Sequence, residues 1–288
     1  VQELQERLEP YISACNGPQR LFRIASRLLK GNDSTFNIRI MRDGNAVDVK
    51  LLSGARQIAY PAFDFRLHPG PWKVLPGNIG YIDLRMFASV DAAKDTIGAA
   101  MQVVADTDAL IVDLRNNGGG DPHTVAFMSS YLFDKRTHLN DMAWRHDGSR
   151  ESFWTQDEVP GKRFGGQKKI YVLTSKKTFS GAEEFSYNMQ QLKRATLVGE
   201  TTGGGAHPGG MRRLHPHLSV FIPSGRAVNP VSKSNWEGTG VIPDVRVAAD
   251  DALRTAQRLA LKALLEHPRD AMHADLLRKR LAEVDKQG

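Results

Sequence analysis

The sequence has one cysteine, Cys15, among its 288 residues. A single cysteine excludes an internal disulfide framework and a zinc site built from several thiolates. No apolar run approaches the roughly 20 residues that a membrane-spanning helix needs, so no transmembrane segment is predicted. The Gly-x-Gly-x-x-Gly and Walker patterns are also absent, which argues against a dinucleotide or nucleotide site.

A concentrated block of charge is missing as well. The net charge is +7, but the basic residues are scattered and are not interleaved with aromatic residues on one face. A nucleic-acid partner is therefore not expected. The content of 41% hydrophobic and 25% charged residues is typical of a globular chain with one large or two modest domains.

The chain has no initiator methionine and no signal-peptide pattern. It opens at Val1 inside an amphipathic helical pattern, which predicts helices over Val1–Ser13 and Gln19–Lys30. This abrupt start leads us to expect that the natural N-terminus is missing. An Asp-Gly turn then joins two alternating strands, Phe36–Ile40 and Val47–Leu51, as a hairpin. Pro- and Gly-rich residues between about 54 and 77 predict a linker.

An alternation of strands and helices follows, which predicts an α/β core. The predicted strands are Gly80–Leu84, Ala109–Arg115, Lys168–Leu173, Ala195–Gly199 and Leu218–Ile222, and the predicted helices are Val90–Val104, His123–Phe133 and Ala182–Leu192. The polar segment Leu139–Gly166 is expected to form a loop or hairpin excursion. The last two helices, Asp250–Leu265 and Ala271–Val284, are expected to be exposed.

Ser180 lies where a buried strand gives way to a helix. A hydroxyl on such a turn is accessible, and the next amide, that of Gly181, belongs to a helical first turn whose N–H groups lack intrahelical partners. This setting suits a nucleophilic serine. Ser180 and Glu183 also fit an ordinary capping box, which would stabilise the helix without any chemistry.

Two loops are dense in glycine. Asn116–Gly120 follows a central strand, and its consecutive glycines can present backbone amides to an oxyanion or a phosphate. A plain strand-to-helix turn explains this segment equally well. The second loop, Glu200–Gly210, follows the strand that ends at Gly199.

Motifs in a fixed order carry a family resemblance. They are Asp113–Gly120, Ser180–Glu183, Gly199–Gly203 and Gly240–Asp244. Together they resemble the serine peptidases that include the carboxyl-terminal-processing proteases and the tricorn core, with the interphotoreceptor retinoid-binding protein as a relative. The resemblance implies a ClpP/crotonase-like α/β core with Ser180 as nucleophile and the backbone amides of Gly119 and Gly181 as an oxyanion hole.

The general base is where the sequence departs from this family. The processing proteases carry a catalytic lysine at the position of Gly205, and Lys176 and Lys177 match no catalytic position. The tricorn-like branch instead uses a histidine oriented by a glutamate that matches Glu237. That histidine either lies outside this chain, which we favour, or is replaced by His207, or is genuinely absent.

The predicted organisation has four parts. Residues 1–58 form a partial PDZ-like helix and hairpin subdomain, 59–77 a linker, 78–250 the ClpP/crotonase-like core, and 251–288 a C-terminal helical tail. A generic α+β subdomain explains the first part equally well.

The predicted function is that of a serine endopeptidase acting on extended polypeptides through an acyl-enzyme. The alternative is a non-catalytic carrier of apolar ligands, as in the retinoid-binding relatives, and an acyl-thioester enzyme is a third reading. No metal or cofactor is expected, because His215 and His217 lack a third ligand at suitable spacing. The resemblance leaves a homo-oligomer open and suggests the periplasm or cell envelope.

Overall fold

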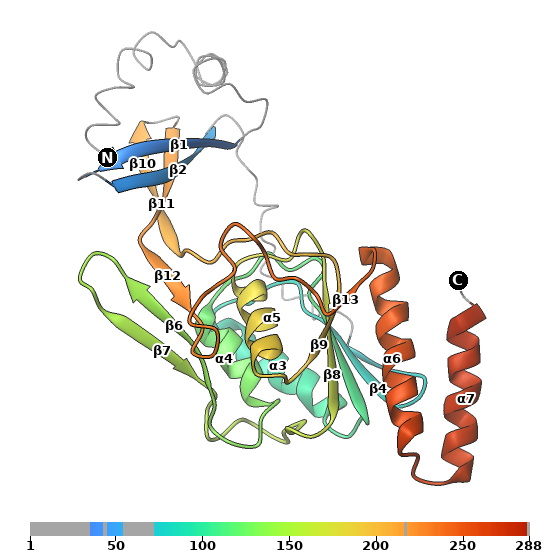
Figure 1. Ribbon diagram of the computed structural model, residues 1–288. Helices are drawn as coiled ribbons and strands as arrows, with labels where there is room; N and C mark the ends of the chain where they lie inside the picture. The colour runs from blue at the N-terminus through green and yellow to red at the C-terminus, as the bar shows by residue number, and fades with distance from the viewer. Residues whose placement is uncertain (1–34, 43–44, 54–71, 216–217, 287–288) are drawn as a thin grey trace. The chain divides into compact units, whose positions relative to one another are not determined.

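The computed structural model describes residues 35–42, 45–53, 72–215 and 218–286 (Figure 1). These residues divide into two units, one drawn from residues 1–66 and 207–226 and the other from residues 67–206 and 227–288. The two predicted N-terminal helices, Cys15 and most of the predicted linker lie outside the described residues.

The first unit contains a four-stranded antiparallel sheet. Its strands are β1 (Thr35–Arg42), β2 (Asn45–Ser53), β10 (Gly209–His215) and β11 (Leu218–Pro223), in the order β1-β2-β11-β10. The predicted hairpin is confirmed as β1 and β2. Leu218 lies opposite Ser53, so a second hairpin from far along the chain completes the sheet. The sequence analysis predicted that this subdomain ends at residue 58 and did not assign β10 and β11 to it.

The second unit is built on a six-stranded sheet. Its strands are β3 (Lys73–Leu75), β4 (Ile79–Asp83), β5 (Ala109–Asp113), β8 (Lys169–Thr174), β9 (Thr196–Gly199) and β13 (Val245–Arg246). The order is β13-β9-β8-β5-β4-β3, and every pairing is parallel except that of β3 with β4. β3 lies inside the segment that was predicted as a linker.

Helices cover both faces of this sheet (Figure 1). On one face α3 (Val90–Val104), α4 (Pro122–Ser130) and α5 (Gly181–Gln191) pack against residues such as Leu110 and Val112 of β5. On the other face the alternate residues Ala109 and Ile111 contact α6 (Ala252–Glu266) and α7 (Ala271–Lys286). A parallel sheet buried on both faces requires such continuous apolar strands.

The C-terminal helices are therefore not simply exposed, as the sequence analysis expected. Ala252, Ala256, Ala260 and Leu261 of α6 have no solvent exposure. Small residues at a spacing of four give α6 a narrow stripe that can approach the sheet closely. The rest of the helix combines charged and polar residues with leucines that are only partly buried, which is why its pattern suggested an exposed helix.

A smaller three-stranded sheet has the order β12-β6-β7. β6 (His138–Trp144) and β7 (Arg150–Trp154) form an antiparallel hairpin, which confirms the predicted excursion of this segment. β12 (Gly225–Val228) lies on the other side of β6, so β7 is an edge strand.

Candidate active site

The predicted site residues follow parallel strands that end at one edge of the sheet. Gly118–Gly120 follow β5, Ser180 follows β8, and the loop Thr201–Ala206 follows β9. Ligand and active sites of open α/β sheets lie at this carboxyl edge.

Ser180 has an unusual backbone conformation. Its φ of 52° and ψ of −120° fall in a region that residues with a side chain rarely occupy. The side chain is half-buried at the first turn of α5. Strain of this kind costs roughly 1–3 kcal/mol and is found where function requires it, as at the sharp strand-to-helix turn of serine hydrolases.

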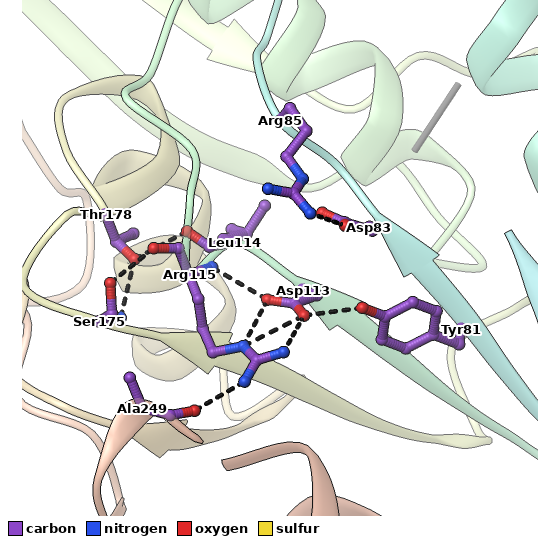
Figure 2. A network of polar contacts seen from close by, with 9 residues as sticks. All are labelled: Tyr81, Asp83, Arg85, Asp113, Leu114, Arg115, Ser175, Thr178 and Ala249. Carbon is purple, nitrogen blue, oxygen red and sulfur yellow. Dashed lines mark hydrogen bonds and ion pairs between the residues drawn. The ribbon is translucent and has the colours of Figure 1, made fainter. Parts of the chain in front are cut away.

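The strained turn is held by the loop that follows β5. The Thr178 hydroxyl donates to the Leu114 carbonyl at 2.8 Å, and the Ser175 hydroxyl donates to the Arg115 carbonyl at 2.6 Å (Figure 2). These bonds fix the spacing between the two loops, so the turn carrying Ser180 and the glycine turn are positioned together.

The Asp113–Arg115 pair anchors the same loop (Figure 2). Arg115 donates to both carboxylate oxygens of Asp113, at 3.0 and 2.6 Å, and to the carbonyl of Ala249 at 2.7 Å. Tyr81 adds a 2.8 Å hydrogen bond. Burial opposes ionisation of Asp113, but the bonds from Arg115 outweigh it and hold the pKa of Asp113 below its usual value. This arrangement assigns a structural role to the Asp113-Leu-Arg115 motif.

The glycine turn lies directly against the start of α5. A Cβ on Gly119, whose φ is +105°, would lie 2.7 Å from Ser180 Cβ and 2.8 Å from Gly181 N. A Cβ on Gly120 would lie 1.8 Å from the carbonyl oxygen of Phe87. Only glycine fits at either position, and the predicted closeness of Gly119 to Ser180 and Gly181 is present.

The N–H of Gly119 is already engaged. It donates to Asn117 Oδ1 at 2.8 Å, while Asn117 Nδ2 donates to the Leu84 carbonyl at 2.9 Å. Among the described residues, none accepts a hydrogen bond from the N–H of Gly120 or Gly181. Of the two predicted donors, the N–H of Gly181 is therefore available to an oxyanion in this conformation and that of Gly119 is not.

Glu183 connects the turn that carries Ser180 to the second glycine loop. Its carboxylate is fully buried and accepts the N–H of Ser180 at 2.8 Å. It also accepts the N–H groups of Gly204 at 2.6 Å and Gly205 at 2.8 Å, together with the Thr202 hydroxyl. The sequence analysis gave Glu183 only a capping role. The sequence did hold a signal for the wider role. Glu183 belongs to the Ser180–Glu183 motif, and the glycine-rich loop Glu200–Gly210 further along the chain offers main-chain N–H groups that a carboxylate can accept.

Glu237 lies beside the second glycine loop and accepts the N–H of Ala206 at 2.7 Å. The indole of its neighbour Trp236 donates to the Gly205 carbonyl at 3.1 Å, which fixes the segment that carries Glu237. His207 belongs to the other unit, and its role as a base stays a prediction.

The ring of Phe179 fills the space beside Gly205, the residue at the position of the family lysine. A Cβ on Gly205 would lie 2.2 Å from Phe179 Cζ, so a longer side chain there requires Phe179 to move. The neighbouring Lys176 is exposed, with its Nζ 3.8 Å from Glu200 Oε1. An exposed position is in keeping with a lysine that matches no catalytic position of the family.

A second acidic residue of α5, Glu184, is buried without a charge partner. Burial raises its pKa to about 8; the nearby amide of Asn140 partly offsets this rise, and the charge of Asp121 adds to it. Among the described residues, Glu184 Oε1 and the amide of Asn140 have no hydrogen-bond partner. Glu184 is therefore protonated near neutral pH.

Replacing Glu184 by Gln is expected to remove a pH dependence of stability. An unfolded Glu loses its proton near pH 4.5, whereas folded Glu184 retains it to about pH 8. The free energy of unfolding should therefore fall between these values as pH rises, by up to about 1.4 kcal/mol per unit. Urea unfolding at pH 5.5 and 8 measures it. The exposed Glu158→Gln should keep the wild-type slope, and an unchanged slope in Glu184→Gln would contradict the assignment.

Metal ligands do not gather in the described part of the chain, where no group of three or more His, Cys, Asp or Glu could hold an ion. In those same residues no helix is long and apolar enough to cross a membrane.

Residues 78–247, more than half of the chain, match Peptidase family S41. The chain belongs to peptidase family S41. This confirms the predicted resemblance to the carboxyl-terminal-processing proteases at the level of the family.

Known S41 relatives support the assignment. The S41 chain is 27% identical to carboxyl-terminal-processing peptidase 1 of Arabidopsis thaliana over 226 residues, which cover 77% of this chain and 44% of the relative. It is 33% identical to the carboxyl-terminal-processing protease of Synechocystis over 131 residues, or 45% of this chain and 29% of the relative. The chain thus spans less than half the length of these curated relatives.

The fold matches a solved structure, the photosystem II D1 C-terminal processing protease. The TM-score is 0.50 at 22% sequence identity, and the match covers 76% of this chain and 56% of that one. This likeness places the mixed α/β architecture of the S41 chain among known protease structures.

Proposed function

We propose that the protein containing this chain is a serine endopeptidase that cleaves extended polypeptides through an acyl-enzyme on Ser180. The observation that carries the proposal is the strained φ of Ser180 at the start of α5, in contact with Gly119. Ser180 and Glu183 do form the capping box that the sequence also allowed. A capping box does not require this backbone conformation, because Ncap residues ordinarily lie in the β region.

The reaction follows from this placement. The Ser180 oxygen forms a bond to the substrate carbonyl carbon while its proton passes to a base. The C–N bond then breaks and the base returns the proton to the leaving amine. Water then gives a proton to the base and bonds to the acyl carbon. The bond from that carbon to the Ser180 oxygen breaks, and the base returns the proton to Ser180.

The negative oxygen of the tetrahedral intermediate would be stabilised by the N–H of Gly181 and by the glycine turn. Each such donor contributes on the order of 3 kcal/mol. The N–H of Gly119 can take part only after it leaves Asn117 Oδ1, to which it donates in this structure. We infer that substrate binding releases this bond.

The base in this proposal is a histidine oriented by Glu237, as in the tricorn-like branch. A lysine base at the family position is absent, because that position is Gly205. Glu237 contacts Ala206 next to Gly205, which brings its carboxylate to the loop where the base would act. We favour a histidine outside this chain, with His207 as the alternative.

Finer features of the prediction belong to the same proposal. The sheet covered on both faces is consistent with a ClpP/crotonase-like core, and the hairpin of β1 and β2 with part of a PDZ-like module. The substrate would bind as an added β-strand. The homo-oligomer and the cell-envelope location stay predictions.

Labelling by a serine-directed fluorophosphonate tests the nucleophile. In the complete protein, which supplies the base, we expect one label per chain, on Ser180, located by mass spectrometry of the digested protein. Ser180→Ala should abolish the label, and Ser175→Ala should retain Ser180 as the labelled residue, because its hydroxyl only braces the loop.

A folded chain that takes no label, even in the complete protein, would overturn the proposal. That result would favour the non-catalytic carrier, for which the engaged N–H of Gly119 is the supporting observation. Displacement of a fluorescent fatty acid would then measure binding of an apolar ligand.

A further inference from the structure

β7 has an unpaired edge. It is the last strand of its sheet, and no other described strand pairs with it beyond β6 (Figure 1). An open strand edge presents main-chain N–H and C=O groups that can bind another extended segment.

The register identifies which groups face outward. Trp144 N donates to Ser149 O, and Thr155 N donates to Thr137 O, both at 2.9 Å. Hydrogen-bonded and non-hydrogen-bonded pairs alternate in an antiparallel hairpin. Counting along the paired residues, the main-chain groups of Ser152 point away from β6.

A hollow of about 450 Å³ lies along this edge. The β7 residues Glu151–Trp154 all line it, although successive side chains of a strand point to opposite faces, and Thr155–Asp157, which follow the strand, line it as well. The hollow therefore follows the edge of the strand and not one of its faces. His123 and Ala126 of α4 also line it.

The walls suit an extended peptide. Trp154 is 39% exposed, with Arg136 over one face at 5.0 Å and His138 stacked at 4.2 Å, so its ring is held in place. At the other end His123 packs on Phe153 at 5.1 Å and lies 3.5 Å from Glu151. A hollow lined by aromatic rings and by a few charged groups of both signs suits an uncharged peptide backbone that carries mixed side chains.

We propose that this edge of β7 binds the polypeptide substrate as an added strand. The inference rests on the proposed peptidase function and assigns its substrate site. His123 lines the hollow and stands three residues after Gly120, in the first turn of α4, so one lining residue follows closely in sequence on the glycine turn beside Ser180. A strand lying along β7 and continuing past His123 would lead to the nucleophile.

Ser152→Pro tests the added strand, because proline removes the outward N–H and is tolerated in edge strands. Ser152→Ala is the matched control: it also loses the hydroxyl that donates to Asp141 but keeps the N–H. Both are placed in the Ser180→Ala background and titrated with fluorescein-labelled denatured casein. We expect about a tenfold weaker Kd for Ser152→Pro than for Ser152→Ala.

Equal affinities for the two variants, or no casein binding by the parent, would overturn the inference. A change in sedimentation mass without a change in Kd would also overturn it, because a second copy would then occupy the edge. Fluorophosphonate labelling of the chain with native Ser152 and Ser180 tests the peptidase function separately. If Ser180 is labelled but the Kd for casein does not depend on residue 152, the peptidase function stands and the substrate site on β7 is wrong.

Discussion

Gly119→Ala is expected to slow fluorophosphonate labelling of Ser180, and any peptide hydrolysis, by at least about 100-fold. The added methyl group would lie 2.7 Å from Ser180 Cβ and 2.8 Å from Gly181 N, where a substrate carbonyl oxygen would enter. The φ of +105° would strain any residue with a side chain. The second-order rate constant of labelling measures the effect.

Gly118→Ala is the matched control for this experiment. A Cβ on Gly118 meets no atom within 4 Å, and the residue has no positive φ. This neighbour should label at the wild-type rate. Urea unfolding of both variants separates lost chemistry from lost folding, and a folded Gly119→Ala protein that labels normally would remove the glycine turn from the mechanism.

Much of the second unit could be predicted because its signals are local. The strand that ends at Asp113 is a continuous apolar run, and the helix after Ser180 has regular apolar spacing. Parallel strands place their carboxyl ends at one edge, so Ser180 and Gly119 could be expected to approach each other. The bond from Gly119 to Asn117 also had a local signal, since Asn side chains often bind the backbone two residues on.

The parts that sequence reasoning missed depend on distant segments. Nothing near Ser53 indicates that Leu218 lies opposite it, because strand pairing is chosen among all available edges. The buried role of the α6 alanines becomes apparent only when the helix is packed on the sheet that it covers. Glu183 likewise resembles a capping residue until the loop at Gly204 folds onto it.

Glu183→Gln is expected to reduce the labelling rate of Ser180 by about 100-fold. The carboxylate accepts N–H groups from Ser180, Gly204 and Gly205. The amide of Gln has only one acceptor oxygen. Its NH₂ group would face one of these N–H groups, and two donors cannot hydrogen-bond to each other. The turn would shift, and displacements near 1 Å suffice for a loss of this size. The free energy of unfolding should fall by about 3 kcal/mol.

Glu184→Gln provides the comparison within the same helix turn. Both glutamates are buried in α5, but none of the site's N–H groups donates to Glu184. This neighbour should keep the labelling rate, so a loss confined to Glu183→Gln reports the geometry of the turn and not the loss of a buried acid. If both variants label equally fast, the Glu183 bonds do not position Ser180, and the strained turn must be maintained by the other bonds of these loops, such as those of Ser175 and Thr178.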